Sequence, residues 1–265
     1  MIDRNSNLLL TSAASLALIQ FTSAAKANEA SDLAQQLANP IAAIISLPFQ
    51  LNYDENIGAD DEGTRTTLNF QPVIPFELQN GANIVTRTNS PFVSQQDVIP
   101  GTTQEGVGDI LFNAWYSNTT EDGLTWGVGP IVRIPTGSDV STETWAAGVT
   151  GILLKTSGPW TYGGLANHIW DVESDPETPT SSTFIQPFVS YNTPGAVTYS
   201  LTSEATYDWE NEEWSVPINA SIGKLIPVGG VPVNWTAGVG YWADSPESGP
   251  EGWRLRLQAQ IVIPK

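Results

Sequence analysis

The chain has 265 residues, with 28 acidic residues against 10 basic ones and no cysteine. The absence of cysteine excludes a disulfide framework and any cysteine-based zinc or redox site. The excess of carboxylates excludes nucleic acid as a partner, because contacts with phosphates need a basic surface. Abundant glycine, proline and tryptophan (23, 19 and 10 residues) favour an all-β fold with many turns.

The first 27 residues have the pattern of a secretory signal peptide. Arg4 precedes an apolar run from Leu8 to Phe21, and Ala25-Lys26-Ala27 supplies the small residues that signal peptidase recognises. The run is short for a membrane-spanning helix, and no later stretch approaches about 18 continuous apolar residues. We therefore expect export, with cleavage after Ala27.

Residues 28–44 are expected to form a short N-terminal helical segment. Ser31 is a suitable N-cap for a helix over residues 31–38, and Pro40 is a stop signal. A helix this short is not stable alone. It therefore has to dock on the domain that follows, as a periplasmic element or as a plug at one end.

From residue 45 to the C-terminus the chain shows the period-two alternation of β-strands. The alternation is clearest over residues 197–209, where Tyr199 and Leu201 face one way and Ser200 and Thr202 face the other. It is ambiguous in the third, sixth, seventh and eighth segments. We expect twelve strands, at residues 46–53, 64–78, 82–92, 108–117, 124–134, 144–155, 160–170, 183–191, 197–209, 214–225, 233–242 and 253–263.

The last expected strand, residues 253–263, has two different faces. Its odd-numbered residues are Trp, Leu, Leu, Ala, Ile and Ile, whereas its even-numbered residues begin with Arg254 and Arg256 and continue with two glutamines. Its length is about that of a tilted strand that crosses a bilayer. In a soluble sandwich the apolar face would be core. In a membrane barrel it would face lipid, and the arginines would face a lumen.

The links between the expected strands decide between these architectures. Links after even-numbered strands are short and contain turn sequences such as Asn80-Gly81 and Ser157-Gly158-Pro159. Links after odd-numbered strands are mostly longer, lack Lys and Arg, and hold, with their flanking residues, 20 of the 27 acidic residues that follow Ala27. Outer-membrane barrels have short periplasmic turns, long outer loops and an even number of strands. We therefore predict a barrel closed by pairing of residues 253–263 with residues 46–53.

Aromatic residues agree with this prediction, because barrels carry aromatic girdles at both membrane interfaces. Ordinary core tryptophans of a sandwich are the alternative explanation. The aromatic residues near the expected strand ends are Tyr53, Trp115, Tyr116, Trp126, Trp145, Trp160, Trp170, Tyr207, Trp209, Trp214, Tyr241, Trp242 and Trp253.

Several segments resemble a family of Gram-negative outer-membrane transporters, the phenol-degradation meta-pathway-like barrel proteins, some of which carry a misleading neuromedin U label. The matching segments are spread over nearly the whole mature chain: Ile45 to Gln50, Leu68 to Pro75, Gly106 to Ile110, Trp126 to Pro130, Gln186 to Val189 and the closing Pro264-Lys265. The resemblance implies an outer-membrane β-barrel and a transport role that includes hydrophobic solutes. It implies no catalytic or ligand-binding residues.

The candidate site residues are the charged residues expected to line the lumen. Ionisable groups at membrane depth are costly unless they face water or one another. They could select a small solute, or they could be a structural network of salt bridges that fills a narrow barrel. The candidates are Arg65, Arg87, Arg133, Arg254 and Arg256, paired with Glu77, Asp109, Glu204 and Asp208.

Catalytic and metal sites are not indicated. His168 is the single histidine, and no nucleophile motif surrounds a serine. Glu204 and Asp208 lie about 13 Å apart at strand rise, too far for a catalytic carboxylate pair. The acidic runs 60–62 and 171–177 could bind Ca²⁺ or Mg²⁺, but their spacing is not that of an EF-hand, and solvated loop acids are the simpler explanation. We assign no metal, cofactor or catalytic residue.

The sequence thus predicts an all-β, antiparallel up-and-down transmembrane barrel over residues 45–265, exported to the outer membrane of a Gram-negative cell. The predicted function is a passive transporter or channel for small solutes. The alternatives are a non-conducting structural or binding barrel, an exported β-sandwich and, third, a barrel hydrolase. Expected partners are outer-membrane lipid and lipopolysaccharide, a small-molecule solute and the barrel-assembly machinery.

Overall fold

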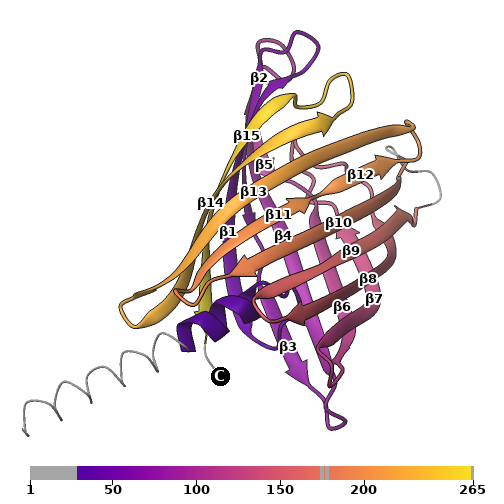
Figure 1. Ribbon diagram of the computed structural model, residues 1–265. Helices are drawn as coiled ribbons and strands as arrows, with labels where there is room; N and C mark the ends of the chain where they lie inside the picture. The colour runs from indigo at the N-terminus through magenta and orange to yellow at the C-terminus, as the bar shows by residue number, and fades with distance from the viewer. Residues whose placement is uncertain (1–28, 174–175, 177–178, 264–265) are drawn as a thin grey trace, which may run out of the picture.

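The computed structural model describes residues 29–173, 176 and 179–263 of the chain. The predicted signal peptide lies outside the described residues. The chain forms one antiparallel sheet that closes into a tilted barrel (Figure 1). Its strands are β1 (Ile45–Ile57), β2 (Gly63–Phe70), β3 (Val73–Glu77), β4 (Asn83–Gln96), β5 (Thr103–Val107), β6 (Ile110–Thr119), β7 (Leu124–Ile134), β8 (Ala146–Ser157), β9 (Trp160–Asp171), β10 (Ser181–Asn192), β11 (Val197–Ser203), β12 (Ala205–Asp208), β13 (Glu213–Val228), β14 (Val231–Asp244) and β15 (Gly252–Ile263).

The first and last strands close the barrel. β1 and β15 pair antiparallel from Ile45↔Ile263 to Tyr53↔Leu255, and β9 pairs with β10 on the other side of the sheet. Closure leaves no row of unpaired backbone groups in the bilayer. The predicted pairing of the two terminal strands, and with it the barrel fold, is confirmed.

The fifteen strand segments make twelve barrel strands, because three of the twelve are each interrupted once, at a proline or opposite a proline of a neighbouring strand. Pro72 separates β2 from β3, and β11 and β12 separate between Pro187 of β10 and Pro217 of β13. Gly108, between β5 and β6, donates to the Pro91 carbonyl at 2.8 Å, where the register of β4 shifts by one residue. Proline has no N–H to donate to the ladder, so strands break or bulge beside it.

The two ends of the barrel differ. The end with short turns, here called the turn end, has the links 78–82, 120–123, 158–159, 193–196 and 229–230. The two-residue link Gly229-Gly230 has positive φ at both residues, as a hairpin of type I′ requires. The opposite end, here called the loop end, has the links 58–62, 97–102, 135–145, 172–180, 209–212 and 245–251. Several strands run further into this end than predicted. In particular, β4 and β5 extend the ladder into residues expected to form a loop.

The outer surface of the barrel is apolar. Leu255, Leu257 and Trp253 on β15 are 57%, 56% and 68% exposed, whereas Arg254 and Arg256 between them are 7% and 6% exposed. The two faces of this strand are therefore assigned as predicted. Phe76, Phe92, Val128, Val149, Leu153 and Leu201 continue the exposed apolar surface around the barrel.

Most of the aromatic residues lie on the outer surface near the two ends. Tyr207 packs on Trp209 and Trp214 at the loop end, and Trp160 packs on Tyr191 at the turn end. Two tryptophans expected in the girdles point inward instead. Trp115 is fully buried inside the barrel, and Trp242 lines the interior cavity. Alternation along the strands puts both on the inner face. Trp115 is two residues from the inward-facing Asn113 on β6, and Trp242 is two residues from Gly240, which lies opposite the inward-facing Arg254.

A short helix over residues 29–37 docks across the turn end, the end at which β15 also finishes (Figure 1). Its Ala34 packs against Ala196 and Leu225, and the Ser31 hydroxyl donates to the Thr193 carbonyl at 3.2 Å. None of the described helical residues forms a segment long and apolar enough to cross a bilayer. The helix is an accessory of the barrel, held by the β10–β11 turn and by β13.

Replacing Leu257 by arginine tests whether the outer surface faces lipid. Leu257 lies near the middle of β15 and faces outward. Arginine near the bilayer midplane costs about 2–4 kcal/mol, against about 0–1 near an interface. Leu257→Arg should therefore lower the free energy of unfolding in lipid vesicles by the larger amount. Trp253→Arg, at the loop end of the same strand, is the matched control. Equal effects of the two substitutions would contradict a lipid-facing surface.

Candidate functional site: the barrel interior

The barrel encloses a cavity of about 760 Å³. Its wall is built by inward-facing residues of β1, β2, β3, β4, β6, β7, β9, β10, β12, β13, β14 and β15, because alternate residues of a strand share one face. On β1 these are Ser46, Pro48, Gln50, Asn52 and Asp54. The turn end of the cavity is lined by residues of the segment that leads into β1: Asn39, Pro40, Ala42 and Ile44. The polar faces of the strands therefore form a continuous interior surface.

A buried polar network joins the closing strands. The Arg254 guanidinium lies 3.1 Å from one Asp54 carboxylate oxygen and donates to the other at 3.2 Å. The Trp242 indole N–H donates to Asp54 at 2.8 Å, and its ring lies 4.9 Å below the Arg254 guanidinium. Gly240 on β14 leaves room for this arrangement, since a Cβ there would lie 2.5 Å from Arg254 Cγ. The charge of Arg254 is thereby neutralised inside the barrel wall.

Arg256 links this network to the strand formed by β11 and β12. It donates to both oxygens of the Glu204 carboxylate, at 2.9 and 2.7 Å, and its Nε donates to Asn52 at 2.8 Å. Glu204 lies at the break between β11 and β12, opposite Pro217. A bidentate contact of this kind fixes both side chains. The pair spans the inner face of β13 and β14, where Gly238 and Gly240 are small.

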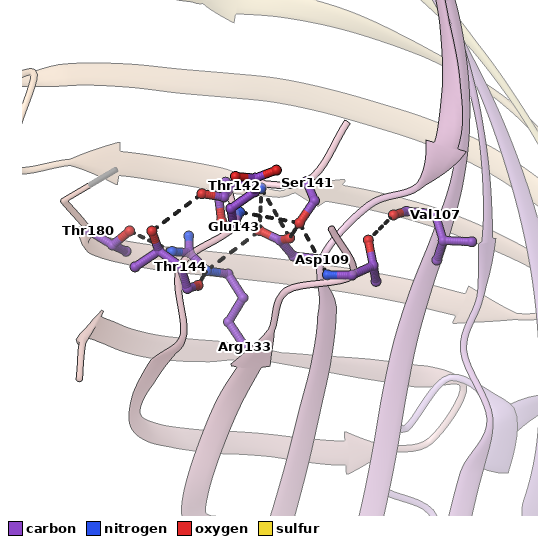
Figure 2. A network of polar contacts seen from close by, with 9 residues as sticks. Val107, Asp109, Arg133, Ser141, Thr142, Glu143, Thr144 and Thr180 are labelled. Carbon is purple, nitrogen blue, oxygen red and sulfur yellow. Dashed lines mark hydrogen bonds and ion pairs between the residues drawn. The ribbon is translucent and has the colours of Figure 1, made fainter. Parts of the chain in front are cut away.

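A second network fastens the β7–β8 link, residues 135–145, to the inner wall at the loop end (Figure 2). The Asp109 carboxylate accepts from the Ser141 hydroxyl at 2.6 Å and from the Thr142 backbone N–H at 3.2 Å, and lies 3.6 Å from Arg133 Nε. Arg133 in turn donates to the Thr144 carbonyl and to the Thr180 hydroxyl, at 3.2 and 2.6 Å. The link is held across the loop end of the cavity by these contacts.

Apolar side chains close the turn end. Ile41 is 3% exposed and packs among inward-facing residues of the barrel wall. Gly127 makes this possible, because a Cβ there would lie 3.0 Å from Ile41 Cδ1. The wall residues of this cluster are Val73, Val85, Trp115, Ile152, Leu154 and Leu165. The segment after the docked helix therefore occupies the barrel at this end, as a plug.

Six of the nine predicted lumen residues line the cavity: Arg65, Arg87, Arg133, Arg254, Asp109 and Glu204. Arg256 is buried in the wall beside them, in its contact with Glu204. Glu77 is exposed at the turn end of β3, and Asp208 accepts from the backbone N–H groups of Glu210 and Asn211 in its own link. Among the described residues, Glu77 and Asp208 make no ion pair with the arginines.

Sequence reasoning missed Asp54, Trp242 and the β7–β8 link. Asp54 was predicted to be the first residue of the acidic link after residues 46–53. In the structure it belongs to β1 and follows Gln50 and Asn52 on the inward face. Extending the alternation by two residues would have found it. Nothing in the sequence indicates that Ser141 and Thr142 fold back onto Asp109.

His168 lies apart from the cavity. Its neighbours Asn167 and Ile169 line the cavity, so its ring faces outward, where Nδ1 lies 2.8 Å from the Thr183 hydroxyl. The Trp170 ring is 5.6 Å away. Among the residues that the structure describes, no group of three or more Asp, Glu or His is placed to hold a metal ion. Part of the acidic run 171–177 lies outside the described residues.

No family model and no curated protein matches the chain. Solved structures do. A crystal structure of an outer membrane channel from Pseudomonas putida F1 matches with a TM-score of 0.66 and 15% identity, over 83% of this chain and 94% of that chain. The KdgM porin in complex with disordered oligogalacturonate matches with a TM-score of 0.50 and 9% identity, over 83% and 99%. The outer membrane phospholipase of Salmonella typhi follows, with a TM-score of 0.48 and 11% identity, over 88% and 96%.

The fold is thus that of outer-membrane β-barrels, with twelve antiparallel strands. At these identities the likeness concerns the fold. The narrower family suggested by the sequence segments stays a prediction.

Proposed function

We propose that this protein is an outer-membrane channel that lets small solutes diffuse through the barrel. The observation that carries the proposal is the polar cavity inside a closed barrel whose outer surface is apolar. Such a surface has its complement in lipid, and a wall of Asn, Gln, Ser, Thr and Arg side chains has its complement in water and polar solutes. The matched Pseudomonas putida F1 channel and the KdgM porin support it by their shared fold.

The charge of the interior favours anionic solutes. Five arginines (Arg65, Arg87, Arg133, Arg254 and Arg256) face four carboxylates (Asp54, Asp109, Asp171 and Glu204) on the inner wall. The whole chain, by contrast, carries a net charge of −18. A lumen with an excess of cations attracts anions and repels cations along the diffusion path.

In this proposal the turn end faces the periplasm and the acidic loop end faces outward among lipopolysaccharide. Insertion would require the barrel-assembly machinery. A barrel that conducts nothing is the alternative, because the plug around Ile41 and the ion pairs would also stabilise a closed barrel. A hydrolase is the third alternative, and its candidate residue His168 lies on the outer face of the barrel, with Nδ1 2.8 Å from the Thr183 hydroxyl.

Conductance in planar bilayers tests the proposal. The purified barrel should produce ion currents with a reversal potential on the anion-selective side in a salt gradient. Arg133→Gln should shift the reversal potential in the direction of lower anion selectivity. Lys155→Gln removes an equal charge from an exposed pair with Asp122 and should leave it unchanged. A folded, heat-modifiable barrel that neither conducts nor releases solutes from liposomes would overturn the channel proposal.

A further inference from the structure

Arg87 differs from the other arginines of the interior. Three of them contact a carboxylate within 4 Å, and Arg65 donates to Gln95 at 2.7 Å. Arg87 makes no hydrogen bond or ion pair with the described residues, and its Nε is buried without a partner. The carboxylate that interacts with it electrostatically is Glu204, whose two oxygens are already hydrogen bonded to Arg256. The guanidinium thus lies inside the barrel with its donors uncommitted.

The surroundings of Arg87 hold it ready for an anion. Its guanidinium lies 5.4 Å from the centre of the Trp115 ring, which is fixed by an N–H bond to Thr150 at 3.1 Å. Asn113 is its direct partner across the β4–β6 ladder, and Asn89 lies two residues along β4. Both residues line the cavity. The buried atom without a partner in each is the amide oxygen, which an anion cannot satisfy, so the amide N–H groups are the ones that can donate to an anion. A buried cation with free donors is costly unless an anion joins it.

An apolar strip lies beside this group of donors. Ile131 follows Asn113 across the next ladder, so it stands two strands from Arg87, about 10 Å at the usual strand spacing. Leu111, Ile131, Ile169 and Phe184 line the cavity together, on β6, β7, β9 and β10. A molecule that places an anionic group on Arg87 would therefore lay a body of about one ring in length against apolar side chains.

We propose that Arg87, with Asn113 and Asn89, forms a binding site inside the barrel for a small organic monocarboxylate with an apolar body. The guanidinium binds the carboxylate, the amides donate to its oxygens, and the strip from Leu111 to Phe184 takes the apolar body. The site deepens the proposed channel function and rests on it, because a solute reaches Arg87 through the barrel. It would make the channel selective by transient binding rather than by size alone.

Equilibrium binding tests the site, with benzoate as the probe and benzamide as its neutral counterpart. Titration calorimetry on the folded barrel in detergent should show benzoate binding and much weaker benzamide binding. Arg87→Gln should weaken benzoate binding about 10- to 100-fold, the value of a hydrogen bond to a charged group. Lys155→Gln is the control, since it removes an equal charge from an exposed pair outside the cavity, and should change benzoate binding less than about twofold. Arg87→Lys should recover part of the loss.

Flux measurements separate this site from the channel proposal. Binding that depends on Arg87 without benzoate flux into liposomes would support the site and overturn the channel. Flux with benzoate binding that is equal in the wild type and in Arg87→Gln, both heat-modifiable on gels, would overturn the site and support the channel. Equal binding of benzoate and benzamide would also overturn the site.

Discussion

Deleting residues 29–44 should raise the single-channel conductance by roughly threefold or more, because conductance is limited by the narrowest part of a pore. The physical reason is the position of the segment: Ile41 packs inside the barrel against wall residues such as Val85 and Leu165, and Pro40, Ala42 and Ile44 line the cavity beside it. Without the segment, water and ions replace these side chains at the turn end. Planar-bilayer recordings of the truncated and full-length mature chains measure the change.

Two point variants separate the plug from the docked helix. Ile41→Ala removes side-chain volume inside the barrel and should raise the conductance in the same direction, by less than the deletion. Ile99→Ala makes the same chemical change at an exposed position of the loop end and should leave the conductance unchanged. If the deletion and the full chain conduct equally, the segment does not obstruct the pore and the turn end is open by another path.

Replacing Glu204 by alanine should destabilise the barrel by about 3–5 kcal/mol, the cost of leaving a buried charge without its partner. Arg256 is 6% exposed and gives two hydrogen bonds to this carboxylate. In Glu204→Ala, Arg87 also loses its favourable electrostatic interaction with the Glu204 carboxylate. Urea unfolding in vesicles, read by tryptophan fluorescence, measures the loss.

Glu77→Ala is the control for this experiment, because Glu77 is exposed and makes no ion pair within the described chain. It should change the free energy of unfolding by less than about 0.5 kcal/mol, as surface substitutions usually do. The double variant Glu204→Met with Arg256→Met should be more stable than Glu204→Ala, since it removes the unpaired charge as well. An unfolding midpoint of Glu204→Ala equal to that of the wild type would show that the ion pair is energetically neutral.

The fold was predictable because lipid imposes a simple rule on sequence. Every second residue of a barrel strand contacts lipid, so apolar and polar residues alternate along the sequence of each strand. β7 begins and ends at the predicted residues, and β15 begins one residue earlier than expected. The strand breaks were harder to predict, because the break between β11 and β12 depends on Pro187 and Pro217 in the two neighbouring strands.

The interior site was predictable only in part. Alternation places Arg254 and Arg256 on the inner face, but it cannot say which carboxylate each one meets across the barrel. That choice depends on register and on small residues such as Gly240. Trp115 and Trp242 were assigned to the girdles because they lie near strand ends. Both occupy inward-facing positions in the alternation of their strands. The fold-back of the β7–β8 link has no local sequence signal.

The contacts between β1 and β15 have a consequence for the order of assembly. Asp54 and Arg254 are 200 positions apart in the chain, and they meet only when the first and last strands pair. Until then Arg254 lacks its carboxylate partner, although Arg256 can already pair with Glu204, and the bilayer core opposes the entry of an unpaired Arg254. A half-closed sheet would therefore stall at the membrane surface, and the seam would form as the barrel enters. The buried charge of Arg254 thus favours insertion of the closed barrel over insertion of an incomplete sheet.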